Sequence, residues 1–542
     1  MKTSEAYVES LRGLNRDIYM FGEKLENPVD HPFLKPSLNA MAMTYELAHD
    51  TEYQDLATAP SSLIDEPINR FTHLHQSADD LVKKIKLQRV LGQKTAVCFQ
   101  RCVGWDAMNA LDSVTYEIDQ ALDTGYHKRF RSFLQYVQEE DLVCNGAMTD
   151  VKGDRSLSPS QQVDPDMYVH IVDENNEGIV VRGAKVHQTG IVNSHEIIVM
   201  PTASLREPDA DYALSFAIPT DTPGVTVILG RQSCDTRLME GGEIDPGNTK
   251  FGGHEGLVIF EDVLVPWERV FMCREYQFAR MLVERFSAYH RQSYGGCKVG
   301  LGDVAIGAAA LISEYNGVDK ASHIRDKIVE MVHLNETLYS CGLACSSEGK
   351  ATKVGTFLVD VMLANVTKHN ITRFPYEILR LLEDIAGGLM VTLPSEKDFR
   401  DEELGPKIDK YLKGKADVPT EYRFRLLRLI ENMAFGRAAV GYRAESMHGA
   451  GSPQAQRIMI ARRVDFEEKK KLAKTLAGIA DLAAQTTGGS LGSMLAPAKI
   501  IVGCSTAGLS GEEGQVLRRT IVYGILIAAA IGIVVWIAAH YV

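Results

Sequence analysis

Two cysteines four residues apart, Cys98 and Cys102 in the stretch VCFQRCVG, are the first residues whose types and spacing suit chemistry. If this stretch is helical, both sulfurs leave one face of the helix about 6 Å apart, which suits a shared metal and equally suits core packing. Cys341 and Cys345 have the same spacing within an ordinary helical run. Spacing alone therefore does not separate a ligand pair from buried thiols.

A third thiol and an imidazole occur together in AYHRQSYGGCKVG, where His290 and Cys297 are seven residues apart, or nearly two helical turns. With the first pair they make three thiolates and one imidazole, a sufficient set for a four-iron cluster or a structural zinc ion. Gly295 and Gly296 would let the backbone approach a bulky inorganic group, and Lys298 would offset its negative charge. These neighbours favour a metal site over simple packing.

The elements that must position these residues follow from the periodicity of the chain. Residues 1–145 repeat apolar side chains at three and four positions and predict an N-terminal helical domain. Residues 146–275 contain short β-rich runs such as GIVVRGAKVHQTG and GLVIFEDVLVP, separated by Gly, Pro, Asn and Asp, and predict a central antiparallel β domain. Residues 276–484 return to helical periodicity and predict a C-terminal helical bundle. The predicted fold class is α+β.

Composition narrows the class of protein. The 542 residues are 45% hydrophobic and 24% charged, as in a globular soluble body, and the formal net charge of −13 argues against nucleic-acid binding. The nine cysteines are an odd number and thinly spread, and the N-terminus has no apolar secretory stretch. We therefore expect free thiols in a reducing cytoplasm.

The end of the chain has a different texture. Residues 485–520 are rich in Gly and Ser and predict a linker, and residues 521–539 read IVYGILIAAAIGIVVWIAA, nineteen residues without a charge. That length is sufficient to cross a bilayer, and Arg518 and Arg519 just before it would keep the main body on the cytoplasmic side. The alternatives are a helix buried in an oligomer and a segment foreign to the native product.

The chain from about residue 5 to about residue 480 resembles the 4-hydroxyphenylacetate 3-monooxygenase group of acyl-CoA-dehydrogenase-like flavoproteins, and within it the acyl-CoA dehydratases. The resemblance is carried by long strings: INRFTHLHQSADDL, AMTDVKGDRSLSPS, YHRQSYGGCKVG, ITRFPYEILRLLEDIAGGLMVT and ESMHGAGSPQAQRIMIAR. It implies an acyl-CoA-dehydrogenase-like fold and a homotetramer whose flavin site is shared between subunits. The apolar tail departs from the family, whose members are soluble.

The resemblance also implies the cofactors and their ligands. A [4Fe-4S] cluster is implied at Cys98, Cys102, His290 and Cys297. FAD is implied at residues of three segments, namely Thr149, Arg155 and Ser156 in AMTDVKGDRSLS, Thr189, Gly190 and Asn193 in HQTGIVNSHE, and Gly387 and Gly388 in EDIAGGL. Without the resemblance, the last glycine pair is equally a helix C-cap.

The implied reaction is the dehydration of 4-hydroxybutyryl-CoA to crotonyl-CoA, together with vinylacetyl-CoA Δ-isomerisation. It removes a C3 hydrogen that a thioester does not acidify, which the family achieves by transient one-electron oxidation of the substrate. The resemblance gives His290 the roles of iron ligand and base, and it implicates Glu255, Tyr294 and Lys298 in proton transfer or orientation. It assigns no role to Glu445 or His448.

Two other functions stay open at this point. One is a flavin-dependent aromatic hydroxylase that has kept thiols at the cluster positions. The other is a non-catalytic, membrane-tethered scaffold in which the four ligands hold a structural zinc ion.

Overall fold

The computed structural model describes residues 1–479, 496–509 and 511–541. The chain divides into two units, Met1–Arg462 and Arg463–Val542. In the first unit, helical, β and helical segments follow one another as predicted, whereas the predicted domain boundaries stay predictions. The predicted boundary at residue 484 and the start of the predicted linker lie outside the described residues.

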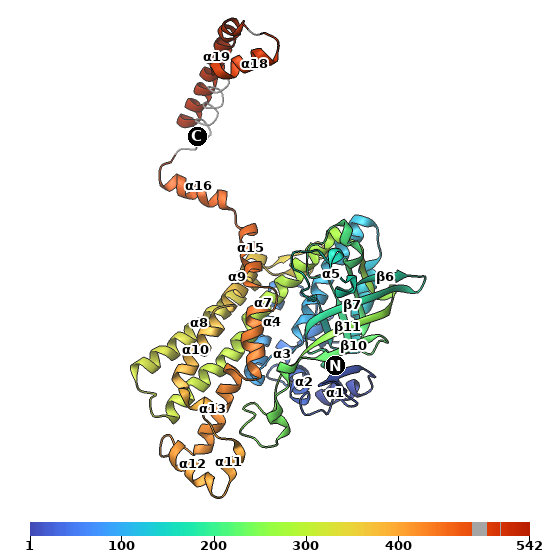
Figure 1. The fold of residues 1–542 in the computed structure, drawn as a ribbon, viewed down its shortest axis with the longest axis vertical. Helices are drawn as coiled ribbons and strands as arrows, with labels where there is room; N and C mark the ends of the chain where they lie inside the picture. Colours follow the sequence, from blue (N-terminus) through green and yellow to red (C-terminus); the bar gives the residue numbers. More distant parts are fainter. Residues whose placement is uncertain (480–495, 510, 542) are drawn as a thin grey trace. The chain divides into compact units, whose positions relative to one another are not determined.

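The N-terminal segment is mainly helical (Figure 1). Its helices are α1 (Ser4–Arg12), α2 (Lys35–His49), α3 (Gln54–Ala57), α4 (Ala78–Thr95), α5 (Cys102–Leu122) and α6 (Tyr126–Glu139). Helix α4 begins where the Ser77 hydroxyl accepts the Asp80 N–H, with Asp79 and Asp80 in its first turn. Both features stabilise a helix N-terminus. The helix ends because Ala96 is left-handed, with φ of 54°.

The strands form two principal sheets. Their bounds are β1 (Asp17–Met20), β2 (Glu23–Lys24), β5 (Cys144–Ala147), β6 (His170–Glu174), β7 (Gly178–Thr189), β8 (Glu196–Val199), β9 (Leu214–Pro219), β10 (Val225–Leu229), β11 (Glu255–Pro266) and β12 (Val270–Cys273). One sheet has the order β2-β1-β10-β11-β7-β6 and the other the order β12-β9-β8-β5. Two short pairs stand apart: β3 (Thr58–Ala59) with β4 (Ile68–Asn69), and β13 (Lys350–Ala351) with β14 (Phe357–Leu358).

The predicted antiparallel arrangement is wrong for two pairs, because β1–β10 and β5–β8 are parallel. Strands β1 and β5 come from the N-terminal segment and join strands distant in the chain. A parallel pair needs a crossover connection of this kind, and a local hairpin pattern does not predict it. The other neighbouring pairs of the two sheets are antiparallel.

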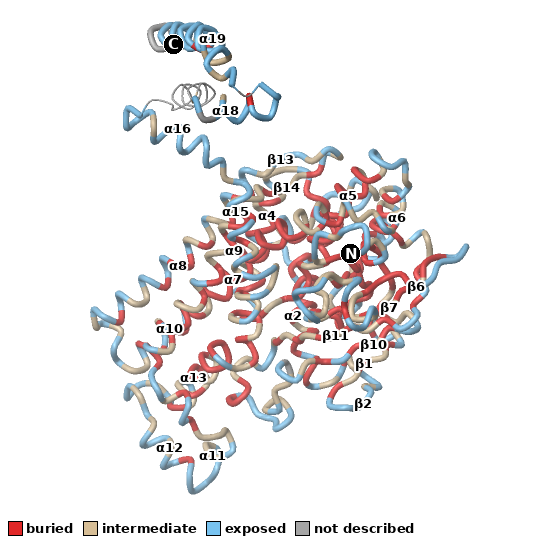
Figure 2. Tube along the Cα trace, turned by 45° about the horizontal axis from the view of Figure 1, so that its top comes forward, coloured by how far each residue is buried: buried red, intermediate tan, exposed pale blue. Residues whose placement is uncertain are grey.

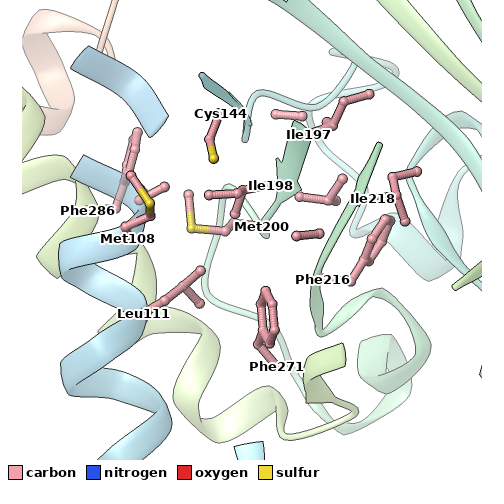
Figure 3. Packing of buried hydrophobic residues seen from close by; sticks show 14 of the residues in the cluster. Met108, Leu111, Cys144, Ile197, Ile198, Met200, Phe216, Ile218, Phe271 and Phe286 are labelled. Atoms are coloured by element: carbon pink, nitrogen blue, oxygen red, sulfur yellow. The ribbon is translucent and has the colours of Figure 1, made fainter. Parts of the chain in front are cut away.

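The largest core packs against both faces of the four-stranded sheet, with α5 and α7 (Tyr276–Tyr315) on one face and the six-stranded sheet on the other. Figure 3 shows Met108 and Leu111 of α5 and Phe286 of α7 on the side of Ile198 in β8 and Phe271 in β12, whereas Phe216 and Ile218 of β9 extend to the opposite side. There the Phe216 ring lies 6.2 Å from the ring of Phe260 in β11. The residues labelled from these strands are Ile197, Ile198, Phe216, Ile218 and Phe271. These side chains are nearly inaccessible to solvent, so the helices that carry the predicted metal ligands are fixed to the sheet by apolar packing.

The helical bundle is built around α7, a helix of 40 residues that is buried over much of its length (Figure 2). The remaining helices of the unit are α8 (Ser322–Ser347), α9 (Val361–Ile371), α10 (Phe374–Ala386), α11 (Glu396–Arg400), α12 (Leu404–Leu412), α13 (Thr420–Ala434), α14 (Glu445–His448) and α15 (Pro453–Arg463). Residues Val440–Ala444 before α14 form a π-helix, a local widening that often marks functional sites.

The second unit contains α16 (Phe466–Leu476), α18 (Pro497–Thr506) and α19 (Glu513–Tyr541). Helix α18 lies inside the range predicted as a linker, and α19 contains the predicted tail. Among the described residues two helices are long and apolar enough to cross a membrane. They are α7, which is mostly buried in the protein, and the Glu513–Ile537 part of α19, whose apolar 18-residue window is 6% buried.

Candidate functional site

Cys98 and Cys102 do not lie on one helix, which corrects the geometry first considered for this pair. Cys98 lies in the connection after α4, and Cys102 is the first residue of α5. The connection contains two left-handed residues, Ala96 and Gln100, with φ of 54° and 67°. These dihedrals break the helical path between the two cysteines.

Two of the four predicted metal ligands nevertheless come together. Cys102 and His290 offer ligand atoms within 4.8 Å of each other, and Asp106 offers a third at the same range. Burial raises the pKa of the Cys98 thiol, and the neighbouring Cys102 and Cys297 thiols raise it further. Cys102 and Cys297 are buried and Cys98 is half-buried, and such thiols are stable as neutral groups, or as thiolates when a metal supplies the compensating charge. The donor set therefore fits a thiolate-bound metal.

One face of α7 carries four of the predicted residues. His290, Tyr294, Cys297 and Lys298 stand at positions i, i+4, i+7 and i+8 of this helix, which is one stripe of an α-helix. All four are buried. A single straight helix thus presents an imidazole, a phenol, a thiol and an ammonium group toward the same region.

Asp106 orients the His290 ring, and the sequence analysis missed this residue. Its Oδ2 lies 2.8 Å from His290 Nδ1 and also accepts a hydrogen bond from the Ser293 hydroxyl at 3.2 Å. Its Oδ1 accepts from the Lys84 ammonium group. The one available signal was the spacing, because Asp106 follows Cys102 by four residues and so lies on the same face of α5.

Gly295 and Gly296, which precede Cys297, have another role than the one predicted. A Cβ at Gly295 would stand 2.7 Å from the Gly342 backbone of α8, and a Cβ at Gly296 would stand 2.6 Å from the Ile85 carbonyl oxygen of α4. These glycines allow close contact between helices. The prediction that they admit an inorganic group was wrong, because their open sides face neighbouring backbones.

A pair of carboxylates lies beside the thiols. The Thr189 hydroxyl is 2.8 and 2.7 Å from the two oxygens of Glu255, at the start of β11. Burial raises the pKa of Glu255 well above its ordinary value, and the nearby charge of Glu445 raises it further. Lys298 donates to Glu445 Oε2 at 2.6 Å. Burial alone would lower the pKa of Lys298, but Glu445 and the Cys297 and Cys98 thiols together outweigh burial, and the net shift is upward.

The segment that carries Glu445 is held in place by buried cations. Lys298 donates to the Gly441 carbonyl, Lys368 of α9 to the Ser446 carbonyl, and Arg291 to the Ala450 carbonyl at 3.1 Å. Carbonyls of a π-helix and a short helix lack regular partners, so these donors satisfy them. Lys368 is fully buried and carries no sequence signal that separates it from a surface lysine.

Tyr294 lies between two of these cations. The ammonium groups of Lys298 and Lys368 are 5.1 and 4.5 Å from the centre of its ring. A Cβ at Gly449 would stand 1.9 Å from the Tyr294 hydroxyl oxygen, so that position accepts only glycine in this arrangement. Burial raises the pKa of Tyr294 well above its ordinary value, which keeps the phenol protonated.

The predicted flavin residues lie in different surroundings. Thr189 and Gly190 lie at the end of β7 near Glu255, and Asn193 is 2% exposed with its amide donating to Ser37 Oγ at 2.7 Å. The remaining five are exposed or half-buried: Thr149, Arg155 and Ser156 in the stretch after β5, and Gly387 and Gly388 at the end of α10. Gly387 has φ of 76° and ends α10.

A cavity of about 380 Å³ opens in the β domain beside the Ser156 loop. Ser156 and Leu157 line one part of it, and Lys185, Met200 and Tyr212 line another. Its size suits part of a cofactor. Of the eight predicted flavin residues, only Ser156 lines it.

The family models that match the chain cover nearly all of it. Residues 3–272 match the description "4-hydroxyphenylacetate 3-hydroxylase N terminal" and residues 279–478 match "4-hydroxyphenylacetate 3-hydroxylase C terminal". Residues 470–542 match a different description, "L-lactate permease". The change of family falls at the end of the helical bundle.

Comparison with individual proteins identifies a smaller group within this family. The chain is 61% identical over 488 residues to 4-hydroxybutyryl-CoA dehydratase/vinylacetyl-CoA-Δ-isomerase of Clostridium aminobutyricum, an alignment that covers 88% of this chain and 100% of that protein. A solved archaeal 4-hydroxybutyryl-CoA dehydratase from N. maritimus is 60% identical, with a TM-score of 0.87 over 89% of this chain and 95% of that one. The oxygenase component of 4-hydroxyphenylacetate 3-monooxygenase, solved with FAD, is 25% identical, with a TM-score of 0.77 over 90% of this chain and 99% of that one.

Identity of 61% over the whole length of a relative shows more than a shared fold. The non-catalytic scaffold considered from the sequence is thereby excluded. The chain belongs to the family of 4-hydroxybutyryl-CoA dehydratase/vinylacetyl-CoA-Δ-isomerases within the 4-hydroxyphenylacetate 3-hydroxylase group, and it is a lyase with isomerase activity.

Proposed function

We propose that the chain dehydrates 4-hydroxybutyryl-CoA to crotonyl-CoA and isomerises vinylacetyl-CoA with the help of FAD and a [4Fe-4S] cluster. The observation that carries the proposal is the closeness of the Cys102 thiol and the His290 ring, with Cys98 and Cys297 as further free thiols. The names of the two relatives at about 60% identity supply the substrates. The likeness to an oxygenase solved with FAD supports the flavin.

The cluster would be held by Cys98, Cys102, His290 and Cys297. When bound, the flavin and the cluster supply one-electron chemistry and a Lewis-acidic iron for the leaving hydroxyl group. Thr149, Arg155, Ser156, Thr189, Gly190 and Asn193 would contact FAD from their own subunit. Gly387 and Gly388 would contact FAD of a neighbouring subunit, because they are exposed at the end of a helix. We propose a homotetramer with shared flavin sites, as the resemblance to the family implies.

The chain's own groups handle the protons. Glu255, whose pKa burial raises well above its ordinary value, is a stronger base than an exposed carboxylate, and the Thr189 hydroxyl fixes the direction of its oxygens. Lys298 holds Glu445 close to Glu255, so proton uptake by one carboxylate relieves the repulsion between the two. Tyr294, kept protonated by burial, can donate a hydrogen bond toward the same region.

Anaerobic purification tests the proposal directly. We expect a brown protein with about four iron atoms and one FAD per subunit that converts 4-hydroxybutyryl-CoA to crotonyl-CoA. Cys98→Ala should abolish dehydration with loss of iron, whereas Cys341→Ala, a cysteine outside the site, should leave both unchanged. A yellow, iron-free protein that hydroxylates phenols with reduced flavin would instead establish the aromatic hydroxylase.

We also propose that α19 anchors the enzyme to a membrane, with the catalytic unit in the cytoplasm. An 18-residue window in the Glu513–Ile537 part of α19 has a mean hydropathy of 2.5, and the nineteen uncharged residues 521–539 at about 1.5 Å each match the hydrocarbon core of about 30 Å. Arg518 and Arg519 precede the uncharged stretch and favour an N-terminal end on the cytoplasmic side. The 61% identical relative is covered completely without this segment, so the anchor is additional to the enzyme.

Membrane fractionation tests the anchor. The full chain should pellet with membranes and resist carbonate extraction, and the double change Ile527→Lys with Val534→Lys should release it, because each lysine costs about 2.5–3.5 kcal/mol at the centre of a span. Val502→Lys, an equally exposed change in α18, is the matched control and should stay in the membrane. If the full chain stays in the soluble fraction as an oligomer, the helix is buried between subunits.

A further inference from the structure

A buried carboxylate outside the predicted ligand set controls the position of His290. Asp106 has no exposed surface, and its Oδ2 lies 2.8 Å from His290 Nδ1. Ionised carboxylates only accept hydrogen bonds, so Nδ1 carries the hydrogen in this pair. The remaining ring nitrogen, Nε2, is then the one left to bind a metal.

Asp106 is itself held by a second buried charge. The Lys84 ammonium group donates to Asp106 Oδ1 and, at 3.1 Å, to the Tyr289 carbonyl oxygen. It also lies 5.4 and 5.5 Å from the ring centres of Trp105 and Tyr289. A fully buried ion pair gains little stability over apolar side chains of the same size. Its retention here is therefore better explained by what the carboxylate does for His290.

The plane of the His290 ring is fixed as well. Phe286, one turn before it, stacks on the ring with the centres 5.6 Å apart and an angle of 21° between the planes. Tyr294, one turn after it, meets the ring edge-on at 5.2 Å. The ring therefore keeps one orientation, and the hydrogen bond from Nδ1 decides which nitrogen is free.

We propose that Asp106, held by Lys84, is a positioning residue that fixes His290 with Nε2 free for iron and strengthens it as a ligand. A carboxylate on the far nitrogen of an imidazole raises its basicity and fixes its tautomer, as in carboxylate–histidine–metal arrangements. The inference rests on the proposed function in one respect, namely that His290 binds iron.

The rival interpretation makes Asp106 a metal ligand together with Cys102 and His290, since their ligand atoms lie within 4.8 Å. Both carboxylate oxygens already accept hydrogen bonds, Oδ1 from Lys84 and Oδ2 from Ser293 and His290. A metal would have to displace these donors from a fully buried group. The hydrogen-bonded arrangement therefore favours the positioning role.

The test compares Asp106→Asn with Asp112→Asn, a matched control on the same helix. Asp112 is also fully buried and is paired with Arg131 at 3.1 Å, away from the thiols. Both variants and the wild type are purified anaerobically, and three quantities are measured: FAD content, the rate of iron loss to a chelator, and the reduction potential of the cluster. Asp106→Asn should keep FAD, lose iron about 10- to 100-fold faster and have a more positive potential. Asp112→Asn should match the wild type in iron loss and potential.

A milder variant keeps the proposal testable if Asp106→Asn fails to fold. Ser293→Ala removes a donor to Asp106 Oδ2, which leaves the carboxylate a stronger acceptor for His290 and should move the potential in the opposite, negative direction. Shifts of opposite sign are not expected from a general loss of packing. A wild type without iron refutes the proposed function. A wild type with the cluster, combined with potentials and iron loss unchanged in Ser293→Ala and in any folded Asp106→Asn, overturns the positioning role alone.

Discussion

The contact between α4 and α7 beside Cys297 gives the sharpest test of how packing builds the site. Gly296 of α7 faces α4, where a Cβ would stand 2.6 Å from the Ile85 carbonyl oxygen and 2.9 Å from Gln88 Cβ. The first distance is about 0.8 Å short of the 3.4 Å at which ordinary van der Waals contact begins. Because the obstacle is backbone, Gly296→Ala must push the two helices apart.

Two opposing terms set the expected magnitude. Overpacking of a well-packed core costs about 1–3 kcal/mol, and the better helix propensity of alanine returns about 1 kcal/mol. We expect a net loss in the free energy of unfolding of up to about 2 kcal/mol. Since Cys297 directly follows Gly296, we also expect faster loss of iron. Gly307→Ala is the matched control on the same helix, because a Cβ there meets nothing within 4 Å, and it should be neutral or stabilising by up to about 1 kcal/mol.

The assay is urea unfolding of the anaerobic holoenzyme at equal FAD content, followed by intrinsic fluorescence, with iron loss to a chelator measured in parallel. The comparison that matters is between the two alanine variants, since both change one glycine of α7. If Gly296→Ala unfolds at the same urea concentration as Gly307→Ala and keeps its iron, the close contact between the helices is not what positions Cys297.

Three further changes follow from the site and the core. Glu255→Gln should lower dehydration by about 10²- to 10⁴-fold with iron and FAD contents unchanged, and turnover near the wild-type value would remove Glu255 from proton transfer. Gly449→Ala should displace the Tyr294 hydroxyl, which lies 1.9 Å from the added Cβ, and should lower kcat at constant iron content; an unchanged kcat would show that this hydroxyl is not needed. Burial lowers the pKa of His195 and of His254 to about 3, so the unfolded chain binds more protons below the ordinary value of about 6.5. The free energy of unfolding should therefore fall as the pH drops from 6.5 toward 3, by about 1.4 kcal/mol per pH unit for each histidine. In urea unfolding at pH 5, 6 and 7, His195→Gln should remove one histidine's share of this slope, and an equal slope in both proteins would contradict it.

The order of the segments could be predicted because it depends on local patterns. Apolar residues at three and four positions mark the helices, and short runs between turn residues mark the strands. The parallel pairs β1–β10 and β5–β8 could not be predicted in this way, since each joins strands from distant parts of the chain. The break in the helical path between Cys98 and Cys102 could not be predicted either, because Ala96 and Gln100 are residue types that rarely adopt a left-handed conformation.

The four predicted ligands follow from the resemblance to a family, whereas the carboxylates that contact residues of α7 are brought there by long-range contacts. Asp106 meets His290 across 184 positions of the chain, and Lys298 meets Glu445 across 147. Glu445 has no local pattern that separates it from a surface residue of a helix, and Asp106 has only its spacing of four residues from Cys102. Only the folded chain shows that each is a partner of a residue on α7.

The stripe on α7 constrains the spacing of the residues between His290 and Lys298. An insertion of one residue between His290 and Cys297 would rotate the second half of the stripe by about 100°, since an α-helix has 3.6 residues per turn. Cys297 would then point in the direction that Lys298 has now, and Lys298 would point away from the stripe and lose Glu445. On another face of the same helix, Gly296 must meet α4, which also requires this register. The chemical face and the packing face of one helix therefore fix each other, and the register of α7 is a property of the site as much as of the core.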